Sequence, residues 1–283
     1  MTISCLFHNL VPVMKRMTIA QALTIRGTGL HRGGDEEIGL YPSENGIVFI
    51  KDGQPIPAIP ENVVDTQLNT SIGLNGVKIS TIEHLMSAFY GLGITDCTVE
   101  VKGDEIPVMD GSALPFVTHI QQAGLEDLGR EVTPVVITGT VRAELGGSWV
   151  EVSPGSFSVS YEIEFAEQAI GLQRMSFDGD GYIREIAPAR TFGLLKDVET
   201  MRSMGLALGG GLHNAVVVDG KDVLNPEGLR FADEFVRHKI LDILGDLWIL
   251  GAPVMGRVRA FKANHRLHIE CAKKIHKLLG SLR

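Results

Sequence analysis

The sequence predicts an α+β fold in two halves, because the same order of patterns occurs twice along the chain. In each half, segments that alternate apolar and polar residues come first, and segments with helical periodicity follow them. The chain has 283 residues, of which 44% are hydrophobic and 21% charged, so it is long enough for two ordinary domains. Strands followed by helices in this way indicate α+β domains rather than a β-α-β alternation.

The first half begins with a predicted β-meander. A glycine-rich turn at residues 27–34 interrupts it, and three prolines end it before residue 61. The predicted strands cover residues 18–25, 38–40 and 47–50.

A hairpin and a helix follow the meander. The dipeptide Asn75-Gly76 is a strong turn signal between two short apolar segments. Ser80 and Glu83 have the spacing of a capping box, and the helical pattern then continues to Gly91, which supplies a C-terminal stop. A strand at 98–101 and a helix at 115–123 complete this half.

The second half repeats this order after a predicted linker between Gly124 and Pro134. We predict a disordered extension over residues 1–17, an N-terminal domain over 18–128 and a C-terminal domain over 133–283. In the second half, strands are expected at 135–141, 149–152 and 158–165, and helices from about Phe231 and about Arg266.

Charge and cysteine usage argue against several classes of protein. The formal net charge of -8 gives no global field for a nucleic acid. The three cysteines form no Cys-x-x-Cys motif, which argues against a disulfide framework or a thiolate zinc site. The longest apolar run, from Leu247 to Gly256, is shorter than the roughly 18 residues that cross a bilayer. We therefore expect a cytoplasmic protein with no transmembrane segment and no nucleic-acid partner.

The most informative stretch is residues 231–246, a predicted buried helix that carries ionisable side chains. His238 and Asp242 lie one helical turn apart on one stripe, and the opposite side of the helix is apolar too. A buried carboxylate beside an imidazole is costly unless it is paired, hydrogen-bonded or bound to a metal. The spacing therefore indicates either an i,i+4 hydrogen-bonded pair or two ligands of a metal site.

His84 is the best candidate for a third ligand, since it lies inside an apolar helix directly after an acid. A catalytic zinc ion typically takes three protein ligands and leaves one position open. Glu83 could reach a water molecule at such a site and act as a general base, or it could be the acceptor half of the capping box. His84 could equally be a hydrogen-bonded core histidine. Asp246 could be an outward charge, and His265 could start a helix.

Four segments resemble the UDP-3-O-acyl-N-acetylglucosamine deacetylases, the zinc amidases of lipid A biosynthesis in Gram-negative bacteria. They cover residues 79–93, 105–116, 189–193 and 236–246, and the likeness runs from about Thr18 to about Leu279. The resemblance implies two similar layered α/β-sandwich domains with the active site between them. It also implies an insert at about residues 193–229 that forms a passage for the acyl chain.

The resemblance further implies the metal ligands and the base. His84, His238 and Asp242 would bind Zn²⁺, or Fe²⁺ in the cell, because histidine and carboxylate ligands suit both metals. Glu83 would be the general base that removes a proton from the attacking water.

The resemblance also gives roles to the remaining candidates. His265 would be the cationic acid, Asp246 would orient it, and Thr191 would donate a hydrogen bond to the developing oxyanion. The expected substrate contacts are Phe192 on the sugar and Lys239 on the nucleotide. Lys262 is a further candidate for the phosphates on the ground of its charge, without support from the motifs.

The implied reaction is hydrolysis of the acetamide of UDP-3-O-acyl-N-acetylglucosamine, which releases acetate and UDP-3-O-acyl-glucosamine. We expect a monomer that takes this small molecule as its substrate. Two alternatives stay open. They are a metal-dependent deacetylase of another nucleotide sugar, and a non-catalytic sugar-nucleotide binding protein with a structural metal.

Overall fold

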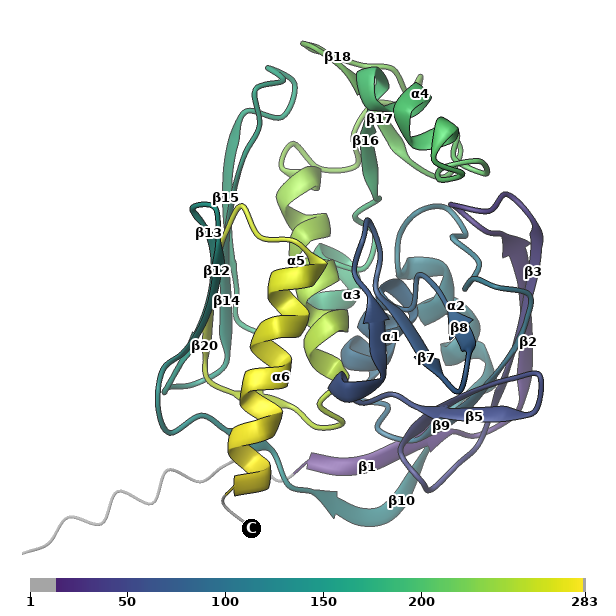
Figure 1. Cartoon of the computed structure of the whole chain (residues 1–283). Coiled ribbons are helices and arrows are strands. Elements are labelled where there is room, and N and C mark those ends of the chain that lie inside the picture. The colour runs from purple at the N-terminus through teal and green to yellow at the C-terminus, as the bar shows by residue number, and fades with distance from the viewer. Residues whose placement is uncertain (1–13, 282–283) are drawn as a thin grey trace, which may run out of the picture.

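Two five-stranded sheets form the outer layers of the protein, whose computed structural model describes residues 14–281 (Figure 1). The first sheet contains, in spatial order, β2 (Leu23–Thr28), β3 (Asp35–Tyr41), β9 (Cys97–Lys102), β4 (Ile47–Lys51) and β5 (Gln54–Pro57). The second contains β12 (Val141–Leu145), β13 (Ser148–Ser153), β20 (Arg257–Phe261), β14 (Ser158–Glu164) and β15 (Leu172–Phe177).

Both sheets have the same topology. In each, the central strand comes last in the sequence and pairs antiparallel with the second strand and parallel with the third. The first two strands form one antiparallel pair, and the third and fourth form another. The prediction of two similar α+β halves is therefore confirmed.

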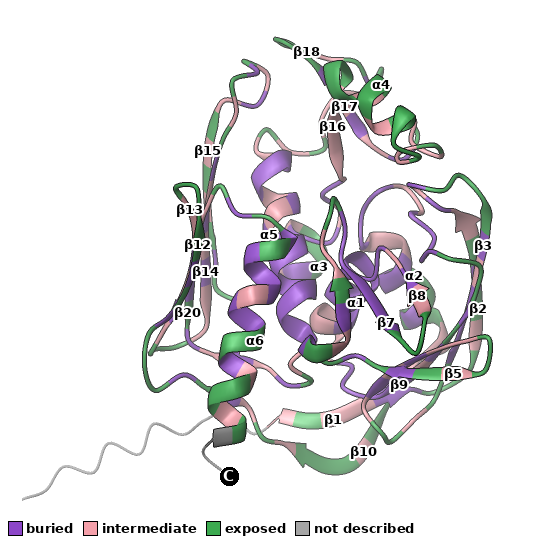
Figure 2. Ribbon diagram, viewed as in Figure 1, coloured by how far each residue is buried: buried purple, intermediate pink, exposed green. Residues whose placement is uncertain are grey.

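Helices fill the space between the two sheets. They are α1 (Glu83–Leu92), α2 (Leu114–Ala123), α3 (Tyr182–Glu185), α5 (Glu234–Trp248) and α6 (His265–Ser281), whereas α4 (Leu195–Ser203) lies outside this layer (Figure 1). Helix α1 packs against α5 at the centre of the molecule, while α6 lies against α5, β12 and β13. Figure 2 shows α1 and α5 almost entirely buried. None of the helices within residues 14–281 is long and apolar enough to span a membrane.

Gly245 lets α1 and α5 approach each other closely. A Cβ atom at this position would lie 2.1 Å from the carbonyl oxygen of Glu83 and 3.0 Å from the amide nitrogen of Ser87. Any larger residue would therefore push the two helices apart. This contact matters for the site because α1 and α5 carry its central side chains.

Smaller elements surround this core. A three-stranded sheet of β6 (Val63–Asp65), β7 (Ser71–Leu74) and β8 (Val77–Ile79) flanks the N-terminal end of α1, after the 3-10 turn η1 (Pro60–Asn62). A second one, of β16 (Phe192–Leu194), β17 (Val216–Asp219) and β18 (Asp222–Val223), forms with α4 a lobe that projects from the body (Figure 1). The remaining strands are β1 (Met14–Ile19), β10 (Leu125–Val132), β11 (Val135–Val136) and β19 (Val254–Met255).

The predicted linker is a strand rather than a loop. Strand β10 pairs antiparallel with β1, so these two segments satisfy each other's main-chain groups. For the same reason the predicted disorder of residues 1–17 is wrong for Met14 to Met17, which belong to β1; residues 1–13 lie outside the described residues. The domain limits of 18–128 and 133–283 stay a prediction.

Candidate metal centre

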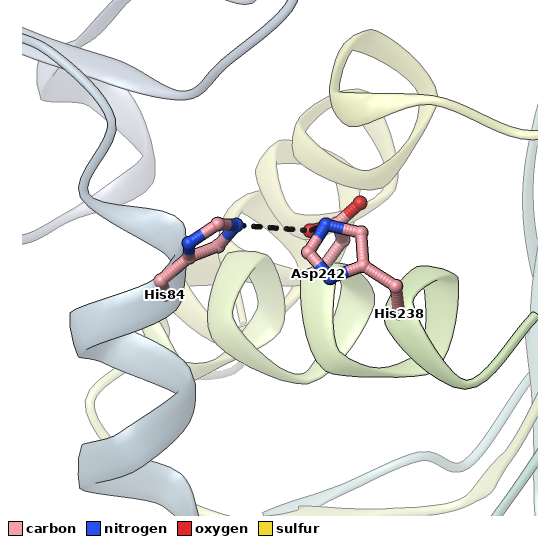
Figure 3. A group of neighbouring side chains, drawn as sticks. All are labelled: His84, His238 and Asp242. Atoms are coloured by element: carbon pink, nitrogen blue, oxygen red, sulfur yellow. Dashed lines mark ion pairs between the residues drawn. The ribbon is translucent and has the colours of Figure 1, made fainter. Parts of the chain in front are cut away.

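Helices α1 and α5 bring three ligand-type side chains together at the centre of the molecule. His84 comes from α1, and His238 and Asp242 come from α5; their rings and carboxylate point toward one another in Figure 3. The Nε2 atom of His238 lies 3.3 Å from Asp242 Oδ1, and the Nε2 atom of His84 lies 3.9 Å from the same oxygen. One ligand atom from each residue lies within 4.8 Å of the others, and all three residues are buried.

Hydrogen bonding leaves these atoms with lone pairs that face one another. The Nδ1 atom of His238 lies 3.1 Å from the carbonyl oxygen of Ala189, which can only accept, so Nδ1 carries a proton. On a neutral ring, Nε2 is then an acceptor that faces an acceptor oxygen of Asp242. Within the described residues, Asp242 Oδ1 has no hydrogen-bond partner. A cation between these atoms would remove the repulsion, so the residues fit a metal ion.

The protonation states also fit a metal site. Burial lowers the pKa of His84 to about 3, and burial lowers the pKa of His238 as well. Burial alone would raise the pKa of Asp242, but the neighbouring His238 and Lys239 outweigh it and hold the pKa well below its ordinary value. Two neutral imidazoles and one carboxylate at pH 7 are the ligand forms that bind a divalent metal.

Glu83 faces the same site and does not cap its own helix. The residue before α1 is Ile82, and within the described residues no side-chain hydrogen bond caps α1, so the capping-box interpretation is wrong. Instead, Glu83 Oε2 accepts a hydrogen bond of 2.9 Å from the amide of Thr70. Burial raises the pKa of Glu83 to about 8, although His265 opposes this. A carboxyl group with a pKa near neutrality is suited to take up and release a proton.

His265 and Asp246 form a buried pair beside Glu83. The Nδ1 atom of His265 lies 2.8 Å from Asp246 Oδ2, and its Nε2 atom lies 3.9 Å from both Glu83 Oε1 and Asp242 Oδ2. Burial alone would lower the pKa of His265, but Asp246, Glu83 and Asp242 outweigh it and raise the pKa to about 9. The ring is therefore an imidazolium at pH 7. The alternative that Asp246 is an outward charge is wrong, because it is buried.

A cavity of about 540 Å³ opens onto these side chains. Thr191 and Phe192, at the start of the projecting lobe, form part of its wall. Lys239 also lines it, with Nζ 2.7 Å from Asp242 Oδ2 and 5.5 Å from the centre of the Phe192 ring. Lys262 is not among the lining residues; its Nζ lies 2.8 Å from Glu164 Oε2 on the second sheet. The structure thus brings together the predicted site residues except Lys262, and Asp246 lies behind His265.

Several residues of the site were missed from the sequence. Thr70 contacts the carboxyl groups of Glu83 and Asp246. Its amide donates to Glu83 Oε2 at 2.9 Å, and its hydroxyl donates to Asp246 Oδ1 at 2.6 Å. Nothing in the sequence connects it with a residue 176 positions away. His268 was not predicted as part of the site, but its ring is fully buried and bonded to Asp246. Its spacing of three from His265 on α6 was the available signal.

Comparison with known proteins gives one consistent result. Residues 16–277 match the family model for UDP-3-O-acyl N-acetylglycosamine deacetylase. The chain is 46% identical over 262 residues to a protein of Campylobacter hominis, covering 90% of this chain and 89% of the relative. It is 45% identical to a protein of Acidithiobacillus ferrooxidans, covering 90% of this chain and 88% of the relative. It is also 45% identical to a protein of Nautilia profundicola, covering 93% of this chain and 92% of the relative. All three relatives carry the name UDP-3-O-acyl-N-acetylglucosamine deacetylase.

Proposed function

This chain belongs to the UDP-3-O-acyl N-acetylglycosamine deacetylase family, and from that premise we propose that it hydrolyses the acetamide of UDP-3-O-acyl-N-acetylglucosamine. The products are acetate and UDP-3-O-acyl-glucosamine, and the reaction is a step of lipid A biosynthesis. One observation carries the proposal. In a buried site that opens to a cavity, ligand atoms of two neutral imidazoles and a carboxylate lie within 4.8 Å of one another.

We propose that His84, His238 and Asp242 hold one Zn²⁺ ion, while Fe²⁺ suits the same ligands. A bound divalent metal supplies Lewis-acid polarisation of a carbonyl oxygen and lowers the pKa of water. The Ala189 carbonyl fixes the His238 ring through Nδ1, which leaves Nε2 free to bind the metal.

Glu83 is the proposed general base. Its carboxyl group lines the cavity next to His84 and is held in place by the Thr70 amide. From this position it takes a proton from the water that attacks the acetamide carbon.

His265 is the proposed acid. Its charge is maintained chiefly by Asp246, whose carboxylate binds Nδ1 and so directs Nε2 toward Glu83 and Asp242. The Nε2 proton can stabilise negative charge and then pass to the departing amine. The Thr191 hydroxyl, on the wall of the cavity, donates to the developing oxyanion.

The substrate is proposed to lie along the cavity wall toward the projecting lobe. Phe192 contacts the sugar, and Lys239 faces the nucleotide. Lys262 remains a candidate for the phosphates, but its place outside the cavity wall supports it less. Apolar residues that the lobe exposes suit the acyl chain; they are Leu195, Met204, Leu208 and Leu212.

A non-catalytic role with a structural metal is the weaker alternative. A structural site is usually closed by four protein ligands, whereas the group here contains three among the described residues. We further propose a cytoplasmic location, because the buried thiols of Cys97 and Cys271 are free, as expected in a reducing compartment. We also propose that the protein is a monomer.

The substrate proposal can be tested with two nucleotide sugars. Purified enzyme is incubated with UDP-3-O-acyl-N-acetylglucosamine or with UDP-N-acetylglucosamine, and mass spectrometry follows the loss of an acetyl group. We expect turnover of the acylated compound only. Equal turnover of both compounds would show that the acyl chain is not recognised and that the enzyme also acts on UDP-N-acetylglucosamine, which would contradict the proposal.

A further inference from the structure

A second histidine binds the same carboxylate oxygen as His265. His268 lies one turn further along α6, and its Nδ1 atom lies 2.7 Å from Asp246 Oδ2, the oxygen that His265 Nδ1 contacts at 2.8 Å. The ring is fully buried, and on its other side Nε2 lies 2.9 Å from the Tyr161 hydroxyl. The proposed mechanism gives no role to His268 or Tyr161.

The neighbouring acceptors determine which ring nitrogen of His268 carries a proton. The pKa of Asp246 is lowered: burial alone would raise it, but hydrogen bonds and charge from the two histidines outweigh burial, so Asp246 is ionised and can only accept. His268 Nδ1 must then carry a proton, whether the ring is neutral or charged. The Tyr161 hydroxyl donates its one proton to the Ala263 carbonyl oxygen at 2.9 Å, and its oxygen lies 2.9 Å from His268 Nε2, so it holds the other side of the ring.

The carboxylate of Asp246 is thereby held on both oxygens. Oδ2 accepts from His265 and His268, and Oδ1 accepts from the Thr70 hydroxyl at 2.6 Å. These donors come from α6 and from the segment before β7, so the carboxylate cannot rotate without breaking a buried hydrogen bond. The orientation of the His265 ring depends on the orientation of this carboxylate.

We propose that His268 is a positioning residue for the deacetylation reaction: its Nδ1 proton, supported by the Tyr161 hydroxyl, fixes the Asp246 carboxylate and through it His265. This inference rests on the proposed role of His265. His268 does not touch the cavity, so its effect reaches the reaction only through Asp246.

Two substitutions separate hydrogen bonding from packing. His268→Leu keeps much of the side-chain volume and removes the donor, whereas His268→Asn places an amide N–H close to where Nδ1 lies. We expect His268→Leu to lower kcat by about 10–100-fold, with KM changed by less than about threefold, because such supporting hydrogen bonds act on the reacting groups. His268→Asn should restore most of kcat. His276→Leu, at a partly exposed histidine of the same helix, is the control and should retain wild-type kcat.

The outcomes decide the proposal. Folded His268→Leu with full metal content and wild-type kcat would overturn it. An equal loss of kcat in the leucine and asparagine variants would also overturn it, since packing alone would then explain the effect. If the leucine variant does not fold, ¹H–¹⁵N spectra of the histidine rings of the zinc-loaded wild-type protein decide instead. A proton on His268 Nδ1 is expected, and a ring protonated only on Nε2 would contradict the proposal.

The spectra need no substrate, so they keep this inference separate from the proposed function. If the wild-type enzyme shows no turnover, the proposed function is wrong. The position of the His268 proton can still be measured in that case. The His268→Asn variant identifies the resonances, because they disappear from its spectrum.

Discussion

At the scale of single residues, the site is defined by side chains whose hydrogen bonds leave one atom free. His238 is fixed by a main-chain carbonyl, and Asp246 is fixed by three donors. Each of these contacts determines the direction of a functional atom while the functional atom itself stays available. The proposed chemistry would therefore depend on residues outside the cavity wall, such as Thr70, Ala189 and His268.

Removing the base should separate metal binding from turnover. Glu83→Gln keeps the shape of the side chain and its contact with the Thr70 amide, but it cannot take up a proton. We expect kcat to fall by about 100-fold or more, the usual contribution of a general base, while zinc content stays at the wild-type level. Metal analysis and steady-state kinetics on the same sample measure both. Glu126→Gln, at an exposed position of β10, is the control, and wild-type turnover in Glu83→Gln would dismiss the assignment.

Removing a ligand should lower the zinc content as well as turnover. His84→Ala leaves two of the three ligand groups, so we expect zinc content after dialysis to fall well below one ion per chain and turnover to fall with it. Inductively coupled plasma mass spectrometry gives the metal content. His119→Ala, at an exposed position of α2, is the matched control. Full zinc content in the His84 variant would show that another residue holds the metal.

The sequence predicted these residues better than their surroundings. His238 and Asp242 are ionisable side chains on a buried helix, where burial is costly without a partner or a metal. This cost allowed the sequence to identify them as site residues. The role of Glu83 as a capping group was an equally good prediction from spacing, but the structure directs this side chain to Thr70. Contacts between distant segments, such as Thr70 with Asp246, leave no local pattern and could not be predicted.

At the scale of elements, the crossing of α1 and α5 brings the ligands together. Gly245 is the point of closest approach, and it lies between Asp242 and Asp246 in sequence and next to Glu83 in space. A glycine inside a helix is normally unfavourable by up to about 1 kcal/mol relative to alanine, so its presence here reflects packing rather than helix propensity.

Substituting this glycine should damage the site without changing any ligand. In Gly245→Ala the added Cβ cannot be accommodated 2.1 Å from a main-chain oxygen, so α1 must move away from α5. We expect a loss of about 1–3 kcal/mol in the free energy of unfolding, the usual cost of overpacking, together with weaker zinc binding. Urea denaturation and zinc titration measure these effects.

The control for this substitution is Gly280→Ala. A Cβ at Gly280, on α6, would meet no atom of the described chain within 4 Å, so this variant should be as stable as the wild type or slightly more. If Gly245→Ala behaves like Gly280→Ala, the close approach of the helices is not needed for the site.

At the scale of the whole molecule, two halves of the same topology place one ligand-bearing helix each at their common boundary. The order of strands and helices predicted two α+β halves, and the family resemblance implied a site between them. The repeat itself is one of strand order and has no matching residue identities. The local structure of the predicted linker was misjudged for a physical reason. Residues 125–132 read as a glycine-containing linker, but they gain main-chain hydrogen bonds from β1, a partner more than a hundred residues earlier in the chain.

A metal that joins the two halves should also stabilise the fold. His84 belongs to the first half and the other two ligands to the second, so zinc binds the folded state in preference to the unfolded one. We expect zinc at about 100 times its Kd to raise Tm by about 5–10 °C relative to chelator-treated protein. Differential scanning calorimetry measures the shift. The His84→Ala variant should show little of it, and an equal shift in that variant would mean that zinc binds elsewhere.

The central claim, that the three buried ligands form the catalytic metal site of a deacetylase, is tested most directly by acetate release during metal depletion and restoration. The wild-type protein is stripped with a chelator, zinc is added back in steps, and acetate release from UDP-3-O-acyl-N-acetylglucosamine is measured against bound zinc. Turnover should be lost on stripping and return in proportion to zinc, reaching its maximum at one ion per chain. Unchanged turnover in the stripped, folded protein, or none in the fully loaded protein, would contradict the account.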